Sequence, residues 1–230
     1  MADPNVQLLV DAAKLLSPLL DELVFVGGSV TGLLITDKGA GDVRPTSDVD
    51  AITEITTYSD YSAFSDRLRK LGFTEDSSEG APLCRFRNGN TTLDVMPLNE
   101  DILGFSNRWY QAAIETAQEL KLETGLLIKV VTAPFFCATK IEAFRARGNG
   151  DYFASHDLED LISVIDGRPE LLDELRLAPY DVRSYISEAV RNMLNNDRFS
   201  NALPGHLPSD AASQGRISIL RETLNDIANL

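Results

Sequence analysis

Three carboxylates stand out in this sequence because of where they are placed. Asp48 and Asp50 lie two residues apart in DVDAITEI, residues 48–55, where polar and apolar residues alternate as in a half-buried strand. Both side chains are therefore expected to point to the same face of that strand. Asp94 lies between apolar residues in TTLDVM, a second alternating segment. Neighbouring strands lie about 4.8 Å apart, so pairing of these two strands would bring the three carboxylates together.

Carboxylates that lie so close repel one another unless they are protonated or neutralised by a cation. A cluster of hard oxygen ligands suits Mg²⁺, which often binds one or two carboxylates together with substrate phosphates. Upstream, Gly27, Gly28 and Ser29 follow the apolar run LVFV. Glycines let a backbone approach a ligand closely, and the start of a helix directs free N–H groups at a phosphate. Each motif taken singly is also typical of an ordinary turn or strand, but their order predicts a site for magnesium and a nucleotide.

The elements that must position these residues fall into two groups. Up to residue 132 the periodicity predicts helices and strands in alternation: helices over 5–20, 30–35 and 59–71, and strands over 23–29, 48–55, 118–123 and 126–132. A β-hairpin over 83–97 is the clearest local pattern, and we expect a type I′ turn at Asn88-Gly89. From Pro134 onward helical periodicity dominates, at 134–147, 155–166, 179–196 and 210–228.

These elements predict an α+β fold, with a mixed sheet flanked by helices and then a helical C-terminal half. The expected domains are residues 1–132, which carry the catalytic carboxylates, and residues 133–230, which complete a cleft for nucleotide and acceptor. With 230 residues, 43% of them hydrophobic and 24% charged, the chain can bury a core without disulfides. A net charge of −14 excludes a protein held on nucleic acid by bulk positive charge, though not one with a local basic patch.

The segments VGGSVTGLLITD, VRPTSDVDAI and TTLDVMP together resemble the nucleotidyltransferase superfamily, whose founding example is DNA polymerase beta. The stretch ATKIEAFRARGNGDYFASHDLEDLI is similar to AbiEii/MenT-type nucleotidyltransferases, many of which are toxins of toxin–antitoxin pairs. The resemblance covers approximately residues 23–166. In one departure from the superfamily pattern, 18 residues separate Ser29 from Asp48, which predicts an inserted loop before the metal-binding strand.

The resemblance implies an Mg²⁺-dependent nucleotidyltransferase with a nucleoside triphosphate as substrate. The Gly27–Ser29 turn would hold the phosphates, and Asp48 and Asp50 would bind Mg²⁺. Asp94 would bind a second Mg²⁺ and help to deprotonate the acceptor hydroxyl. Two divalent ions can stabilise both the attacking and the leaving oxygen in such a displacement.

For the helical half, the resemblance implies that Lys140 contacts the triphosphate and that Asp157 orients Lys140 or the nucleotide. The alternative for Lys140 is a solvated surface lysine. The alternative for Asp157 is a capped helix, with Ser155 as N-cap and an acidic residue beside the positive helix end. For Asp160 we expect this structural role. The scattered basic residues are expected to be mostly solvated, as at Arg44, Arg67, Arg69, Lys70, Arg85, Arg87, Arg145 and Arg147.

Three functions follow as hypotheses. The leading one is transfer of a nucleoside monophosphate to RNA, at a tRNA 3′ end, by the toxin of a toxin–antitoxin pair whose antitoxin is a partner protein. The second is modification of a small molecule such as an aminoglycoside, which an acidic surface would attract. The third is a nucleotide-sensing module that binds a partner without catalysis. Without a basic leader or a long apolar run, the chain is expected in the cytoplasm, away from membranes, with Cys84 and Cys137 buried and reduced.

Overall fold

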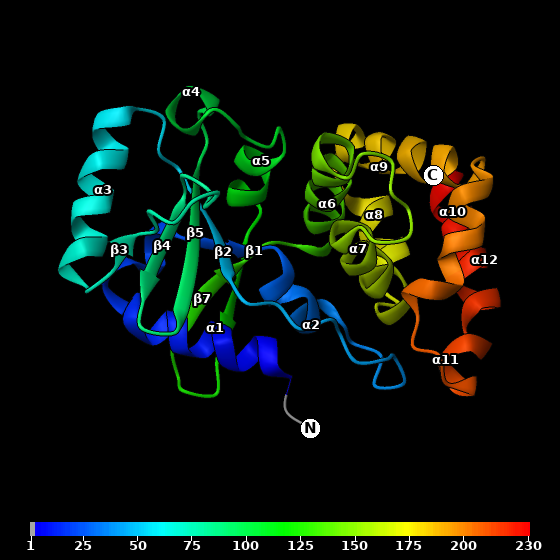
Figure 1. Cartoon of the computed structure of the whole chain (residues 1–230). Coiled ribbons are helices and arrows are strands. Elements are labelled where there is room, and N and C mark those ends of the chain that lie inside the picture. Colours follow the sequence, from blue (N-terminus) through cyan, green and yellow to red (C-terminus); the bar gives the residue numbers. More distant parts are fainter. Residues whose placement is uncertain (1–2) are drawn as a thin grey trace. The chain divides into compact units, whose positions relative to one another are not determined.

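The computed structural model describes residues 3–230, and its contacts divide the chain into two compact units (Figure 1). The sheet unit comprises Met1–Val30 and Pro45–Thr132, and the helical unit comprises Thr31–Arg44 and Ala133–Leu230. The change of unit after Thr132 lies where the sequence analysis divides the chain. The segment Thr31–Arg44, which that division places with the sheet, makes its contacts in the helical unit.

Within residues 3–230 the sheet unit contains a seven-stranded mixed sheet of order β3-β4-β5-β2-β1-β7-β6. Its strands are β1 (Val24–Val26), β2 (Val49–Thr53), β3 (Thr74–Glu75), β4 (Arg85–Asn88), β5 (Thr91–Pro97), β6 (Gln118–Lys121) and β7 (Leu127–Val130). The pairs β2–β5 and β1–β7 are parallel, and the others are antiparallel. The predicted α+β class with a mixed sheet is confirmed.

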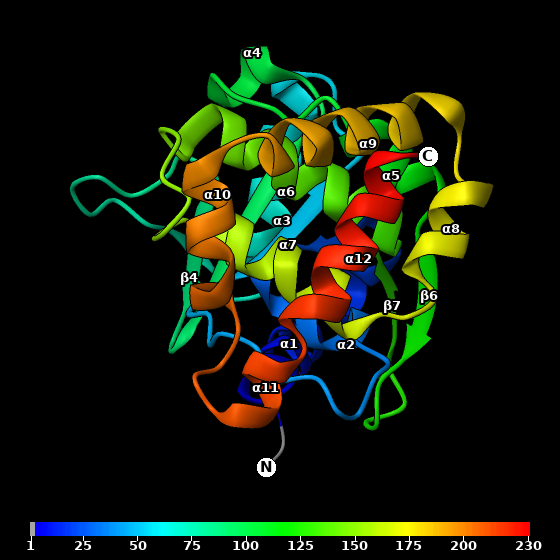
Figure 2. The same cartoon turned by 90° about the vertical axis from the view of Figure 1, so that its right-hand side faces the viewer.

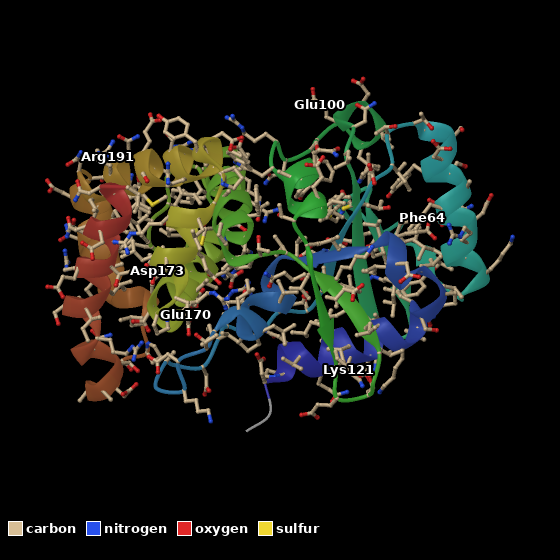
Figure 3. The ribbon with its side chains drawn as sticks, turned by 180° about the vertical axis from the view of Figure 1, so that it is seen from behind. Phe64, Glu100, Lys121, Glu170, Asp173 and Arg191 are labelled. Atoms are coloured by element: carbon tan, nitrogen blue, oxygen red, sulfur yellow. The ribbon has the colours of Figure 1, made fainter. Side chains whose placement is uncertain are left out.

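The core of the sheet unit lies around its central strands, as the apolar runs in the sequence predict. Phe25, Ile52 and Leu93 are fully buried on β1, β2 and β5. Helices α1 (Pro4–Leu15) and α3 (Tyr58–Lys70) pack on this core, and Phe64 of α3 is buried (Figure 3). The remaining helical elements are short: η1 (Ser17–Glu22), η2 (Gly28–Val30), α4 (Glu100–Leu103) and α5 (Tyr110–Glu115). The sequence analysis had extended the first helix to residue 20, across the break that begins the 3-10 helix η1.

The β4–β5 hairpin is present, but its turn lies one residue later than expected. Asn88 pairs with Thr91, so the two turn residues are Gly89 and Asn90. Gly89 has φ +55°, whereas Asn90 is not among the residues with positive φ. A type I′ turn needs positive φ at both positions, while type II′ needs it only at the first, where glycine is favoured. The expected type I′ turn at Asn88-Gly89 is therefore wrong, and the register of the hairpin changes with it.

The helical unit is built around α6 (Ala133–Arg147), which packs on α7 (His156–Gly167) and α9 (Tyr180–Leu194), as Figure 2 shows. Helix α12 (Ile217–Ala228) packs on α9 and α7, and Arg191 of α9 donates to the Ala228 carbonyl (Figure 3). The shorter elements are α2 (Thr31–Leu34), α8 (Leu171–Leu177), α10 (Asp197–Ala202), η3 (Leu203–His206) and α11 (Ala211–Gly215). The single helix expected over 210–228 is wrong, because α11 and α12 are separate.

Specific contacts hold Thr31–Arg44 in the helical unit. The backbone N–H groups of Thr36 and Asp37 both donate to the carbonyl of Gly167, each at 3.0 Å. Arg216, at the break between α11 and α12, forms an ion pair of 2.8 Å with Asp37 and another of 2.9 Å with Asp166. The insertion is therefore an ordered connection and part of the packing of α7. No helix among the described residues is long and apolar enough to cross a membrane.

Candidate functional site

Two of the three predicted carboxylates are direct neighbours in the sheet. Asp50 on β2 and Asp94 on β5 are register partners in a parallel pair, so their side chains leave the same face at the same level. Asp48 precedes β2, and its Oδ1 accepts a hydrogen bond of 2.8 Å from the Thr46 hydroxyl. Asp94 is buried, and Asp48 and Asp50 are partly exposed. The sheet thus brings the three carboxylates together, as the alternation of the two segments predicts.

Arg85 lies among these carboxylates, contrary to the expectation that it is mainly solvated. It is the register partner of Asp94 across the β4–β5 pair. Its Nε donates to Asp94 Oδ1 at 2.8 Å, and its Nη2 donates to Asp94 Oδ2 and to Asp48 Oδ2, each at 2.7 Å. The hydrogen bonds that Arg85 donates to Asp94 raise the pKa of Arg85 above its ordinary value, against the opposing effect of burial. One guanidinium therefore binds two of the three acids, in the side-on geometry typical of strong arginine–carboxylate pairs.

The Gly27–Ser29 turn lies directly beside these acids. β1 is antiparallel to β2 and places Val26 opposite Asp50, so the turn starts next to that carboxylate. Gly27 has φ +69°, and a Cβ built on it would lie 1.9 Å from Asp50 Oδ2. Only a residue without a side chain leaves this carboxylate in place, because any Cβ would overlap it. The turn and the Asp50 carboxylate therefore form one site.

Asn5 of α1 ties the turn to the segment before Asp48. Its Nδ2 donates to the carbonyl of Gly28 at 3.4 Å, and its Oδ1 accepts from the backbone N–H of Thr46 at 2.9 Å. The side chain is 1% exposed, so these bonds are shielded from water. Asn5 is a positioning residue that the sequence analysis missed. An asparagine in the first turn of an amphipathic helix carries no signal that separates it from a surface residue.

The predicted role of Ser29 is only partly supported by its geometry. Its side chain is fully buried, and its hydroxyl donates to the Val26 carbonyl at 3.3 Å. The helix that follows consists of the three-residue η2 and the four-residue α2, far short of the helix that a strong dipole requires. Phosphate binding here would depend on backbone N–H groups of the turn, in which Gly27 is partly exposed and Gly28 and Ser29 are buried.

The donor atoms of Asp48, Asp50 and Asp94 are carboxylate oxygens. Carboxylate oxygens on adjacent strands are the correct donor type for this hard cation. In the described part of the chain, however, no group of three or more His, Cys, Asp or Glu side chains is arranged to hold a metal. Both oxygens of Asp94 and one of Asp48 are hydrogen-bonded to Arg85. The donor atoms have the chemistry that a magnesium ion needs, and in this conformation Arg85 is the cation that binds Asp48 and Asp94.

Lys140 and Asp157 come together in the helical unit, around a buried ion network. Lys140 Nζ lies 2.6 Å from Asp160 Oδ2 and 3.3 Å from Asp157 Oδ1, and its side chain is 9% exposed. The alternative of a solvated Lys140 is therefore wrong. Asp157 and Asp160 are three residues apart on α7 and so share a face, which turns toward Lys140 on α6. Asp160 has a larger role than the helix-surface one expected for it.

Two arginines complete this network. Arg147 donates from Nε and Nη2 to the two oxygens of Asp157, at 2.8 and 2.9 Å, with its own side chain largely exposed. Arg44 Nη2 lies 3.4 Å from Asp160 Oδ2. Burial raises the pKa of Asp157, but its bond to Arg147 and the charge of Lys140 outweigh burial and lower the pKa below its ordinary value. Ser155 accepts from the Leu158 N–H, so the predicted N-cap is confirmed.

The two cysteines and Trp109 are buried in the protein core. Cys84 and Cys137 are both free and buried, as expected, and burial raises the pKa of each thiol to about 12. Trp109 is 4% exposed, with the Arg108 guanidinium 5.0 Å from its ring centroid. These side chains are placed for packing and for stability.

No protein-family model matches the chain, and none of the curated proteins matches it. Among solved structures, JHP933 from Helicobacter pylori is similar over 97% of this chain and 90% of that protein, with 12% identity and a TM-score of 0.47. A second H. pylori structure, provisionally named a nucleotidyltransferase, covers 98% of this chain and 93% of its own, with 9% identity and a TM-score of 0.46. Both TM-scores lie below 0.5, so these likenesses assign no activity to this chain.

Proposed function

We propose that the protein is an Mg²⁺-dependent nucleotidyltransferase that moves a nucleoside monophosphate from a nucleoside triphosphate to an acceptor hydroxyl. The observation that carries the proposal is the contact between the Gly27–Ser29 turn and the Asp50–Asp94 register pair. A glycine turn beside paired carboxylates is suited to a metal-bound triphosphate. Phosphates alone would be repelled by the three acids, so a cation must accompany them.

In this mechanism Asp48, Asp50 and Asp94 would hold the magnesium ions, and the Gly27–Ser29 turn would hold the phosphates. Bound magnesium supplies charge neutralisation at the reacting phosphate. The acceptor oxygen forms a bond to the α-phosphorus, the bond to the bridging oxygen breaks, and pyrophosphate leaves. Asp94 accepts the proton of the acceptor hydroxyl. Its burial shields that step from water, and Asn5 keeps the turn and the Asp48 segment in place.

A second part of the proposal is that Lys140 and Asp157 act on the triphosphate. Only the sequence resemblance supports this part. The geometry of the two residues also fits a structural role, because Lys140 is engaged by two carboxylates of its own unit. A buried lysine that donates to two acids is held in one orientation. A test of nucleotide binding must therefore separate loss of contact from loss of stability.

For the acceptor we propose RNA, at a tRNA 3′ end, with the protein acting as the toxin of a toxin–antitoxin pair. Support comes from the residues of α6 and α7 that resemble the AbiEii/MenT type. The net charge of −14 favours a second candidate, a polycationic small molecule such as an aminoglycoside. The two candidate acceptors have opposite charge, since RNA is anionic and an aminoglycoside is cationic.

The test uses the purified chain with Mg²⁺, each α-labelled nucleoside triphosphate in turn, and either total tRNA or an aminoglycoside. Label on tRNA that requires Asp50 supports the RNA acceptor, and label on the drug supports the alternative. A folded protein that labels neither acceptor with any nucleotide contradicts the proposed function. Asp60→Asn is a matched control, since this acid is exposed on α3 and bonded to Thr57.

A further inference from the structure

Arg85 binds an acid outside its own β4–β5 hairpin as well as one inside it. The side-on pair with Asp94 already satisfies that buried acid, yet Nη2 also reaches Asp48 Oδ2 at 2.7 Å. The other oxygen of Asp48 accepts from Thr46. All four oxygens of Asp48 and Asp94 are thus engaged by donors of this chain.

A cation and a guanidinium compete for such oxygens. Arg85 has its own positive charge and its side chain is 21% exposed, so it has room to leave toward solvent. Binding of a metal ion by Asp48 and Asp94 would place like charges together unless Arg85 withdraws. The two arrangements exclude each other.

We infer that Arg85 is a built-in counter-ion that closes the metal site and must release Asp48 and Asp94 before a divalent cation binds there. This inference rests on the proposed function, because it concerns the same acids. An apparent dissociation constant rises in inverse proportion to the fraction of molecules in the open form. If Arg85 pairs with the acids in about nine of ten molecules, it weakens metal binding about tenfold.

Arg87 offers a matched control on the same strand. It lies two residues further along β4, and its Nε donates to Asp76 at 2.6 Å, away from the site acids. Its side chain is 53% exposed. Arg87→Gln therefore removes one charge from β4 without freeing Asp48 or Asp94.

The experiment titrates Mn²⁺ into the full, metal-stripped chain without nucleotide and follows free Mn²⁺ by electron paramagnetic resonance. Arg85→Gln is expected to bind Mn²⁺ at least about tenfold more tightly than the unchanged protein, and Arg87→Gln within about twofold of it. Arg85→Lys keeps the charge but loses the side-on fork, and is expected to tighten binding severalfold. If Arg85 were purely structural, Arg85→Gln would bind Mn²⁺ more weakly, because loss of the arginine would loosen the site.

Thermal unfolding followed by circular dichroism accompanies each titration. Arg85→Gln should melt lower in chelator and gain more from Mn²⁺ than the unchanged protein. If Arg85→Gln is folded and binds no more tightly, or if Arg85→Lys binds as the unchanged protein does, the inference is overturned. If Arg85→Gln is unfolded without metal, the Arg85→Lys titration decides by the same criterion.

Failure of this inference is distinguishable from failure of the proposed function. If Arg85→Gln binds Mn²⁺ more tightly but no acceptor receives a nucleotide, the counter-ion role of Arg85 is supported and the transferase activity is contradicted. If a nucleotide is transferred but Arg85→Gln binds Mn²⁺ no more tightly, the transferase activity is supported and the counter-ion role is contradicted. If none of the proteins binds Mn²⁺ at millimolar concentration, both the counter-ion role of Arg85 and the metal site are overturned.

Discussion

Asp50 and Asp94 face each other in register on parallel strands, and the Arg85 guanidinium holds Asp94 through two of its nitrogens. Arg85 uses both Nε and Nη2 on Asp94, at 2.8 and 2.7 Å. Asp50 instead lies against Gly27, where the backbone makes room for its carboxylate. In the proposed chemistry both acids would hold magnesium and Asp94 also accepts the proton of the acceptor, and in the fold the two side chains have different neighbours.

Substitution of these two acids should separate activity from stability. Asp50→Asn and Asp94→Asn are both expected to abolish nucleotidyl transfer. Asp94→Asn should also cost about 1.5–3 kcal/mol in the free energy of unfolding, because it weakens charge-assisted hydrogen bonds to Arg85. Asp60→Asn, at an exposed acid on α3, should change that free energy by about 0.5 kcal/mol or less. Urea titrations measure the free energy of unfolding of each variant, and equal losses in Asp94→Asn and Asp60→Asn would contradict the assigned partner of Asp94.

Gly27 should tolerate no side chain. Gly27→Ala adds left-handed backbone strain, about 1–2 kcal/mol, and places a methyl group against Asp50. Gly80→Ala is the control, since Gly80 has φ +81° and a Cβ there meets nothing within 4 Å. Both variants should lose stability in urea, but only Gly27→Ala should lose transfer. Similar stability losses and full activity in both would show that Asp50 can move aside.

Lys140 should contribute strongly to the stability of the helical unit. Lys140→Met leaves Asp157 and Asp160 without their buried cation, and loss of one partner of a buried ion pair costs about 3–5 kcal/mol. Lys38→Met, at an exposed lysine of the same unit, should cost about 0.5 kcal/mol or less. Hydrogen exchange of α6 and α7 would report the loss locally. Unchanged protection in Lys140→Met would show that the network is not stabilising.

The lowered pKa of Asp157 predicts an acid-sensitive contribution to stability. A carboxyl whose pKa is lower in the folded state stabilises that state above its unfolded pKa, about 3.9, and loses this contribution as the pH falls through the folded pKa. The stability difference between the unchanged protein and Asp157→Asn should be constant from pH 5 to 8 and shrink below about pH 4. Denaturant titrations across this range test it. A difference that grows toward low pH would contradict the assigned sign.

Much of the sheet and its acids could be predicted from the sequence, because strand alternation is a local signal. Asp50 and Asp94 emerged from two segments that each alternate clearly. Arg85 did not, because its position depends on the hairpin register. With the turn at Asn88-Gly89, Leu83 would oppose Asp94. The observed turn at Gly89-Asn90 shifts the pairing by two residues and brings Arg85 to that place.

The buried network of the helical unit was harder to anticipate. Spacing of three residues put Asp157 and Asp160 on one face of a helix, but no local pattern shows that this face is turned inward. Lys140 is buried because α6 packs on α7, and which faces of these consecutive helices meet is set by their packing. Burial of a charged side chain depends on its partners, which only the tertiary structure supplies.

The helical unit is discontinuous in the chain, and this has a consequence for synthesis on the ribosome. Thr36 and Asp37 are synthesised roughly 130 residues before Gly167, the α7 residue to which they donate. At about 5–20 residues per second, this segment waits roughly 6–26 s for its partner. During that interval the apolar side chain of Leu34, buried in the finished protein, has no partner from its own unit. The segment therefore completes its packing only after α7 has been synthesised, and expression at low temperature prolongs the interval.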